Sequence, residues 1–431
     1  MKPTTFVVAT ALALATSLRV QTAKADDADC SSINRANVVR CAVAASLSTR
    51  SEQLGLESLE GRRRAASVLL PSNPSVALSG GYTIEPSLRP AERELVWSAG
   101  LSQELEVAGQ RGKRLDVVSA EQRAQQARVV LAQRDAAAAA LVAYFDALAA
   151  NEEARIADRL AALAEAVTAV STARAQAGVS SDLDAQLAQA AATRLGQAQI
   201  AAQQRVATTT AALATIVGLD PARVRPQVAG ELVPLRVVDA AGPALVDAAV
   251  AQRAEVTVAL AEKEASERRA ALYERLRIPN PTLSFAVRRD WIGEQTVNVG
   301  LNFPIPLPAP VGRTYAGEIA EATSLARRAE TDAEHLRRTI RLEVTAAQEA
   351  VLARKRQVDL YPDERVRQIE DTLRTIAQEI DAQRLPVRDA LLTQQALIDF
   401  LYASIEARRS LCFASVELAR TTGLPLERGA R

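Results

Sequence analysis

Few residues in this chain have a type and spacing that could support catalysis. Its one histidine, His335, lies in a predicted helix between Glu334 and Leu336. A catalytic zinc site or a Ser-His-Asp triad would depend on this single side chain, so we expect His335 at a surface position on the helix. The sequence has no Gly-x-x-x-x-Gly-Lys phosphate loop, and no Gly-x-Gly-x-x-Gly follows a predicted strand. We therefore predict no enzyme, no cofactor and no metal site.

Acidic residues near two breaks between predicted helices are the better candidates for function. They are Asp182 and Asp184 at the first break, and Glu379, Asp381 and Asp389 at the second. Where several copies of one carboxylate meet, they repel one another, attract cations and need basic neighbours such as Arg384 or Arg388. The alternative is a solvated helix end with ordinary caps, which fits Asp182 best.

The three cysteines are Cys30, Cys41 and Cys412. If Cys30 and Cys41 share one helix, they lie roughly 16 Å apart, which is too far for a disulfide. An irregular leader before Ser32 would let them meet in an oxidising compartment. A disulfide and separate thiols both stay open at this point.

The composition favours long, closely packed helices. The 431 residues include 52 basic and 51 acidic residues, and this balance argues against a nucleic-acid-binding protein. Aromatic residues make up only 3% of the chain, although 48% is hydrophobic. Such a composition suits helices in close contact better than the large core of a mixed α/β enzyme.

The N-terminus is typical of an export signal. Lys2 precedes an apolar run from Phe6 to Leu18, and Ala23-Lys24-Ala25 provides a small-residue cleavage site. We predict cleavage after residue 25, because this apolar run is too short for a membrane anchor. No later stretch is long and apolar enough for a spanning helix, so we expect either a soluble exported protein or a β-barrel of an outer membrane.

The rest of the chain consists of two repeats. Asn73-Pro74-Ser75 recurs as Asn280-Pro281-Thr282, and Val217-Gly218-Leu219 recurs as Thr422-Gly423-Leu424. A period of about 200 residues indicates a duplicated domain. We predict a first repeat at 26–221, a linker or equatorial segment at 222–241, a second repeat at 242–425 and a tail at 426–431.

Each repeat is expected to begin with a helical stretch and continue into a β-hairpin. The helical stretches are 32–69 and 244–277, and the hairpins are 75–104 and 282–304. Val76, Leu78 and Tyr82 alternate with small or polar residues, and Leu283, Phe285 and Val287 do the same in the second repeat. This period of two predicts strands with one apolar and one small, polar face.

Each hairpin is followed by a predicted helical hairpin, at 110–217 and 312–422. The run from Gln110 to Ala177 contains no proline and would make a rod of roughly 100 Å. Large apolar residues repeat at intervals of three and four, which is coiled-coil spacing. They are Ile156, Leu160, Leu163, Val167 and Val170 in the first repeat, and Val366, Ile369, Leu373, Ile376 and Ile380 in the second.

Four strands of about 8 to 11 residues can cross a bilayer, but they cannot close a barrel. The chain must then oligomerise, and three copies would supply twelve strands. The expected fold class is therefore mainly α with a small β part, in which four transmembrane strands per chain form a trimeric twelve-strand β-barrel continued by an α-barrel. The alternative is the edge of an ordinary soluble sandwich.

These features together resemble the TolC-like outer-membrane efflux proteins, over nearly all of the mature chain. Within that family, the segment Gln103-Glu104-Leu105-Glu106-Val107-Ala108-Gly109-Gln110-Arg111-Gly112-Lys113-Arg114 is similar to the cation-efflux branch of the CzcC and CusC type. Phe303-Pro304-Ile305-Pro306-Leu307 resembles the matching strand exit of the second half, although the following Pro308-Ala309-Pro310-Val311-Gly312 departs from it. Asp27-Ala28-Asp29 before Cys30 is a poor lipidation site, so we expect no lipid anchor.

The resemblance implies a homotrimeric outer-membrane channel with a large periplasmic part. It would partner a periplasmic adaptor and an inner-membrane RND pump, contact outer-membrane lipid and passively conduct heavy-metal cations or other small solutes. Alternatives are a general drug or protein-export channel of the same fold, or a secreted trimeric coiled-coil scaffold without a pore. In the channel reading, Asp381, Glu379 and Asp389 are candidates for a periplasmic gate, with Asp381 preferred. The adaptor would dock on the exposed turns, at Gly178, Val179 and Ser180 and at Leu385, Pro386 and Val387.

Overall fold

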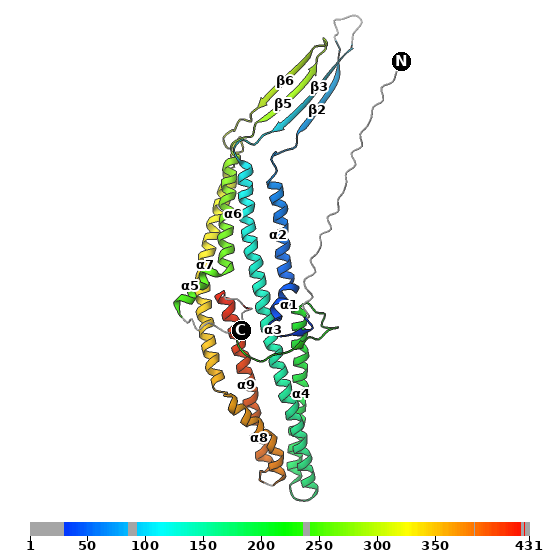
Figure 1. The fold of residues 1–431 in the computed structure, drawn as a ribbon, viewed down its shortest axis with the longest axis vertical. Helices are drawn as coiled ribbons and strands as arrows, with labels where there is room; N and C mark the ends of the chain where they lie inside the picture. Colours follow the sequence, from blue (N-terminus) through cyan, green and yellow to red (C-terminus); the bar gives the residue numbers. More distant parts are fainter. Residues whose placement is uncertain (1–29, 85–92, 236–241, 383, 424–425, 427–431) are drawn as a thin grey trace, which may run out of the picture.

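The protein is an elongated bundle of helices with a small β-sheet at one end (Figure 1). The computed structural model describes residues 30–84, 93–235, 242–382, 384–423 and 426. The predicted signal peptide and most of the predicted tail lie outside these residues. Within them, each predicted repeat supplies helices, a pair of strands and a helical hairpin in the same order.

The first repeat begins at the middle of the molecule. A short strand, β1 (Ser32–Ile33), is followed by α1 (Val38–Ala45) and α2 (Leu47–Ala66). The expectation of one helical stretch over 32–69 is wrong, because two helices occupy it. The chain turns at Ser46, whose extended backbone ends α1 and whose hydroxyl accepts a hydrogen bond from the Thr49 amide at 3.2 Å. Ser46 is thus the N-cap of α2.

Cys30 and Cys41 form a disulfide, with their Cα atoms 6.1 Å apart. Cys41 lies in α1, whereas Cys30 lies before β1, so the two do not share a helix. The irregular leader therefore brings the sulfurs together.

The sheet follows the order β2-β3-β5-β6 and is antiparallel throughout. Its strands are β2 (Ser75–Ile84), β3 (Arg93–Glu104), β5 (Thr282–Arg289) and β6 (Gln295–Asn302). The two predicted hairpins thus join through β3 and β5, with Leu101 opposite Phe285. This junction makes one sheet from two sequence repeats.

One long helix leads from the sheet to the far end of the molecule, and a second helix returns beside it. The first, α3 (Gln110–Gln176), is one uninterrupted helix of 67 residues, and α4 (Asp182–Ile216) returns beside it. Alanines such as Ala140, Ala147 and Ala149 are fully buried in the middle of α3. Their small side chains allow neighbouring helices to approach closely, as the composition predicted.

The second repeat differs from the first in its helix breaks. It contains α5 (Pro243–Gln252), α6 (Ala254–Leu276), α7 (Ala316–Asp359), α8 (Asp363–Asp381) and α9 (Val387–Thr422). The expectations of one helical stretch over 244–277 and of one long helical run after the second β-hairpin are both wrong. The first divides at Arg253, and the second divides just before α8 at Pro362, which takes an extended backbone there.

A hydrophobic core near the middle of the long axis, which we call the equator, joins the two repeats. It packs Tyr144 and Phe145 of α3 against Ile33, Val38 and residues of α9. β1 pairs in parallel with β4 (Gln227–Val228), so the segment after the first repeat returns to the N-terminal leader. The Tyr144 hydroxyl donates to the Ala229 carbonyl at 2.9 Å. A Cβ at Gly230 would lie 2.1 Å from that hydroxyl, which is why the position needs glycine.

The predicted coiled-coil seams meet each other in the lower half. Leu160 and Val167 of α3 form one buried cluster with Leu373, Ile376 and Ile380 of α8. The other five predicted seam residues pack at its edge. The two helical hairpins therefore lie side by side, and their tips meet at the end opposite the sheet (Figure 1).

Candidate functional site

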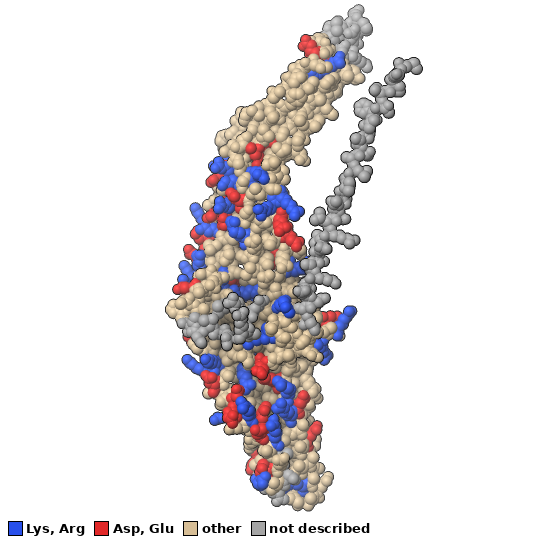
Figure 2. Space-filling model, viewed as in Figure 1, with Lys and Arg blue, Asp and Glu red and all other residues tan. Residues whose placement is uncertain are grey.

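The sheet has one apolar and one small, polar face. On the apolar face, Leu78 lies opposite Ala99, which lies opposite Val287, which in turn lies opposite Val297. No helix in the described part of the chain covers this face, and Leu78 is 77% and Val299 74% exposed. The surface of the sheet is almost free of charge over most of its length (Figure 2). An uncovered apolar sheet of this kind is a surface for a partner or a membrane.

The opposite face carries serines, asparagines and glycines. Ser75 bonds Ser102 and Ser79 bonds Ser98 across β2 and β3, each with hydroxyl oxygens 2.7 Å apart. A Cβ at Gly300 would lie 2.6 Å from the Ser284 hydroxyl, so a larger residue there would require that side chain to move. This face is small enough to line a water-filled passage.

A polar network fixes the base of the sheet to the helices. Gln110 is fully buried at the start of α3 and donates to the Asn280 side chain at 2.8 Å. Asn280 in turn donates to the Glu104 carboxylate at 2.8 Å. Glu106 accepts a hydrogen bond from the Arg111 amide and pairs with Arg114. The motif segment 103–114 and the second Asn-Pro are thus parts of one structural joint between the repeats.

The first hairpin tip is a tight turn between α3 and α4. Gly178 has a φ of +72°, a conformation that favours glycine, and Val179 is 53% exposed. Ser181 is the N-cap of α4, since its hydroxyl accepts a hydrogen bond from the Asp184 amide at 3.2 Å. Asp182 is not the cap itself but is exposed at the first helical position, as at a solvated helix end.

The second hairpin tip carries an ion pair. The guanidinium of Arg384 donates to both oxygens of Glu379, each at 2.7 Å, and this pairing lowers the pKa of Glu379. Asp389 is exposed in the first turn of α9, where a negative charge is favourable. Asp381 ends α8, but its side chain lies outside the described residues.

The apolar residues of the second tip differ in exposure. Leu385 is half-buried and Pro386 is exposed. Val387 was expected on the exposed turn, but it is only 6% exposed and packs with Ile380 and Ala390. Val387 therefore packs in the hydrophobic cluster below the turn and is not part of its exposed surface. Arg174, near the end of α3, donates to the Ile380 carbonyl at the end of α8, so the two tips are held together.

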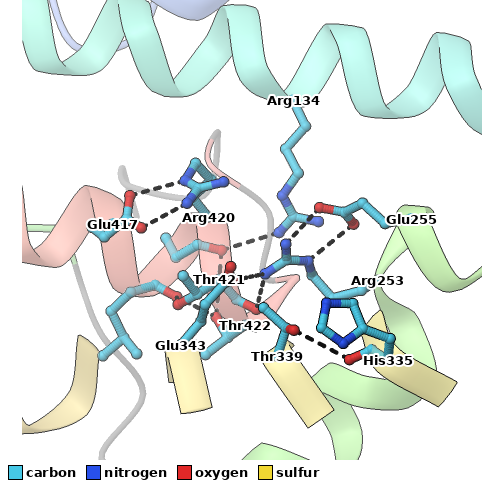
Figure 3. A network of polar contacts seen from close by, with 12 residues as sticks. Arg134, Arg253, Glu255, His335, Thr339, Glu343, Glu417, Arg420, Thr421 and Thr422 are labelled. Carbon is cyan, nitrogen blue, oxygen red and sulfur yellow. Dashed lines mark hydrogen bonds and ion pairs between the residues drawn. The ribbon is translucent and has the colours of Figure 1, made fainter. Parts of the chain in front are cut away.

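The equator contains a buried charge network that the sequence analysis missed (Figure 3). Arg253, at the break between α5 and α6, is only 5% exposed. It donates to Glu255 at 2.9 Å, to Glu343 of α7 at 3.0 Å and to the Thr421 carbonyl of α9 at 3.1 Å. Arg134 of α3 donates to the Ala419 carbonyl at 3.0 Å. Four helices from both repeats are thus bound at one point.

The pKa shifts in this network follow from burial and pairing. Burial disfavours the charged form of Glu255, but the hydrogen bonds from Arg253 outweigh it and lower the pKa of Glu255. Burial and the positive charge of Arg253 lower the pKa of Arg134. The network therefore keeps its charged groups in fixed positions and acts as a structural clamp that holds the four helices together.

The remaining sequence candidates are isolated. His335 is exposed on α7, as expected. Cys412 is buried in the equatorial core, and burial raises the pKa of its thiol to about 12. Among the described residues, no group of three or more His, Cys, Asp or Glu side chains is arranged to hold a metal ion.

None of the helices that the structure describes is long and apolar enough to span a membrane.

Comparison with known proteins identifies the fold. No curated protein matches the chain in sequence. Among solved structures, CusC matches with a TM-score of 0.72 and 13% identity, over 91% of this chain and 92% of that one. VceC from Vibrio cholerae matches with a TM-score of 0.70 and 15% identity, over 91% and 96%. The open-state outer-membrane channel MtrE from Neisseria gonorrhoeae gives 0.68 and 16%, over 92% and 90%.

The sequence itself supports the same assignment for part of the chain. Residues 45–219, which include α2, β2, β3, α3 and α4, match the family model of outer membrane efflux proteins. The chain therefore has the fold of CusC, VceC and MtrE, and its segment 45–219 carries the sequence pattern of the outer membrane efflux protein family.

Proposed function

We propose that this protein is the outer-membrane channel of a tripartite efflux system. Three copies would join their sheets into a twelve-strand barrel, and their helices would form a tunnel in the periplasm. Solutes would pass through passively. The observation that carries this proposal is the two-faced sheet, whose apolar face is bare and whose opposite face is small and polar.

The edges of the sheet support the trimer. In the described part of the chain, β2 and β6 each pair on one side only, which leaves one edge of each strand without hydrogen-bond partners. In a lipid environment such an edge must be satisfied by another strand. β2 and β6 run in opposite directions. β6 of one copy can therefore pair with β2 of the next copy, so that neighbouring strands stay antiparallel around a closed barrel.

The proposed cargo is a heavy-metal cation or another small solute. The cation part of this proposal depends on the resemblance of segment 103–114 to the cation-efflux branch. The polar face of the sheet offers hydroxyl, amide and backbone groups such as Ser98, Asn298 and Gly300, which suit a hydrated ion better than a soft-metal relay. Selectivity would then belong to the inner-membrane RND pump, and the channel would act as a conduit.

We propose the two hairpin tips as the docking site for a periplasmic adaptor. Gly178, Val179 and Ser180 form one turn, and Leu385 and Pro386 form the other, with Val387 buried beneath it. Exposed apolar residues at a turn offer a surface that a partner helical hairpin can cover. The bond from Arg174 to the Ile380 carbonyl would keep both turns in a fixed relation.

The proposed periplasmic gate consists of carboxylates on the second tip. The charge of Glu379 is balanced by Arg384 of the same copy. Three copies of Glu379, brought together in a trimer, would therefore add little net charge to the gate. Asp389 is exposed, and Asp381 stands at the last helical position of α8. Asp381 therefore stays the preferred gate residue, with Asp389 next.

Conductance in planar bilayers tests the channel. The purified protein should give discrete current steps, whereas a pore-free scaffold would stay silent. Val299→Asp places a charge on the apolar face and should abolish insertion. Asn298→Asp is the matched control, because the neighbouring residue of the same strand faces the other side and should insert normally. Equal behaviour of the two variants would refute the assignment of the faces.

Susceptibility assays test the cargo. A strain without the gene should become sensitive to metal salts if cations are exported, and to organic toxicants if the protein is a general drug channel. Restoring the gene should restore resistance to the same class only. Sensitivity to organic toxicants without any change towards metals would overturn the cation proposal while leaving the channel intact.

A further inference from the structure

A band of apolar and basic residues surrounds the base of the sheet, where the strands join the helices. All four connections between helix and strand carry exposed apolar side chains. They are Val68, Leu69 and Leu70 after α2, Val107 before α3, Ile278 before β5, and Ile305, Leu307 and Val311 before α7. Leu69 is 73% and Ile305 82% exposed. The apolar surface of the sheet thus extends onto its connections.

Basic side chains lie in the adjoining helix ends. We call Arg63, Arg64, Arg275 and Arg277 the basic collar. Arg63 and Arg64 belong to the last turn of α2, and Arg275 to the last turn of α6, while Arg277 caps α6. All four are exposed, and in the described part of the chain no carboxylate pairs with any of them. Figure 2 shows the charged ends of the helices directly next to the uncharged sheet.

Two arginine hydrogen bonds hold connections at the base of the sheet, one from Arg111 of α3 and one from Arg277 of the collar. Arg111 donates from Nε to the Ser67 carbonyl at 2.8 Å, which fixes the start of the Val68–Leu70 segment. Arg277 donates from Nε to the Thr314 carbonyl at 3.0 Å, which fixes the connection from β6 to α7. Both acceptors are backbone carbonyls, so neither bond pairs Arg111 or Arg277 with a carboxylate.

We propose that the basic collar binds the headgroups of anionic phospholipids in the leaflet at the helical end of the sheet. This inference rests on the proposed function, in which the sheet crosses the outer membrane. The exposed apolar connections would then reach the boundary between acyl chains and headgroups, and the collar would meet the phosphates. Long basic side chains beside an apolar surface are suited to this position, because they extend towards the polar layer.

Charge complementarity identifies the occupant. Basic residues near a membrane surface attract anionic lipids, and the attraction amounts to roughly a fivefold preference per residue. A protein partner would need acidic residues over an apolar surface that the membrane itself already covers in this geometry. An anionic lipid offers both kinds of contact in one molecule. Its acyl chains would cover the apolar connections, and its phosphate would bind the collar.

Native mass spectrometry of the full-length mature protein tests the proposal. The protein is reconstituted in vesicles of phosphatidylcholine alone or mixed with phosphatidylglycerol, then extracted, and the retained lipids are counted. We expect enrichment of phosphatidylglycerol, which high salt weakens. The variant Arg63→Gln/Arg64→Gln/Arg275→Gln should reduce this enrichment by at least about tenfold.

The control variant removes the same number of arginines elsewhere. Arg356, Arg365 and Arg367 are exposed on α7 and α8, away from the sheet, and their change to Gln should leave the enrichment intact. Equal loss in both variants would overturn the collar as the site, and so would unchanged enrichment in the collar variant. Competition by inorganic phosphate would show binding of any phosphate and overturn lipid recognition.

Conductance separates this inference from the proposed function. A protein that conducts in bilayers of phosphatidylcholine but shows no preference for phosphatidylglycerol keeps its channel role and loses the collar. A protein that neither inserts nor conducts in any bilayer loses both. The collar variant itself should still conduct, because its three arginines lie outside the strands.

Discussion

Removing the charge of Arg253 is expected to destabilise the molecule by about 3 kcal/mol. Its side chain is 6% exposed and pairs with Glu255 at 21% and Glu343 at 36% exposure. Breaking a buried pair costs about 3 to 5 kcal/mol, since the partner charge stays buried. We take the lower end, because Glu343 can regain water and its pairing is discounted accordingly.

The assay is thermal and denaturant unfolding of the detergent-solubilised protein, followed by far-ultraviolet circular dichroism. Arg253→Met is compared with Arg374→Met, whose guanidinium pairs with Asp371 at 2.8 Å while both side chains are more than 60% exposed. The exposed pair should contribute no more than about 0.5 kcal/mol. A double variant, Arg253→Met with Glu255→Leu, should recover part of the loss, because it removes both charges.

The acid side of the stability curve provides a second reading. The pKa of Glu255 is lowered in the folded state, so its pairing contributes stability above the ordinary glutamate pKa and loses it as the pH falls through the folded-state pKa. The difference in unfolding free energy between wild type and Arg253→Met should therefore become smaller in acid. If Arg253→Met costs no more than Arg374→Met at neutral pH, the clamp at the equator is refuted.

Three further predictions concern the tips and the leader. Val179→Asp combined with Leu385→Asp should abolish efflux but leave the trimer intact by native electrophoresis; surviving efflux would place the adaptor elsewhere. Asp381→Asn should raise resting conductance modestly and weaken cation preference, because like charges brought together cost about 1 kcal/mol or more per contact; unchanged single-channel ion preference would return Asp381 to a solvated helix end. Cys30→Ser should lower stability by about 2 to 3 kcal/mol, since the bond to Cys41 closes a short loop; thermal unfolding equal to wild type would exclude that contribution.

The periodicity of apolar residues in the sequence predicts much of the fold. The alternation in Val76 and Leu78 predicted which side chains share a face, and the antiparallel register preserves that alternation across all four strands. The spacing of Leu160 and Leu373 predicted two seams, which pack into one cluster. Such patterns are reliable because strand and helix periods are fixed by the backbone.

Local signals were present in the sequence for two of the helix breaks. Ser46 is a common capping residue, and Pro362 cannot continue a helix that precedes it, yet both were read as parts of longer helices. The third break, at Arg253, has no such signal. Its extended backbone is stabilised by partners on α6, α7 and α9, two of which lie far away in the chain.

The sequence by itself determined the faces of the strands and the long helical hairpins, since each depends on neighbours within a few residues. Only the tertiary structure decided how the repeats join. The pairing of β3 with β5, the return of β4 to β1 and the burial of Arg253 bring together residues that are far apart along the chain. Contacts of that kind depend on the packing of whole helices, and no local period encodes them.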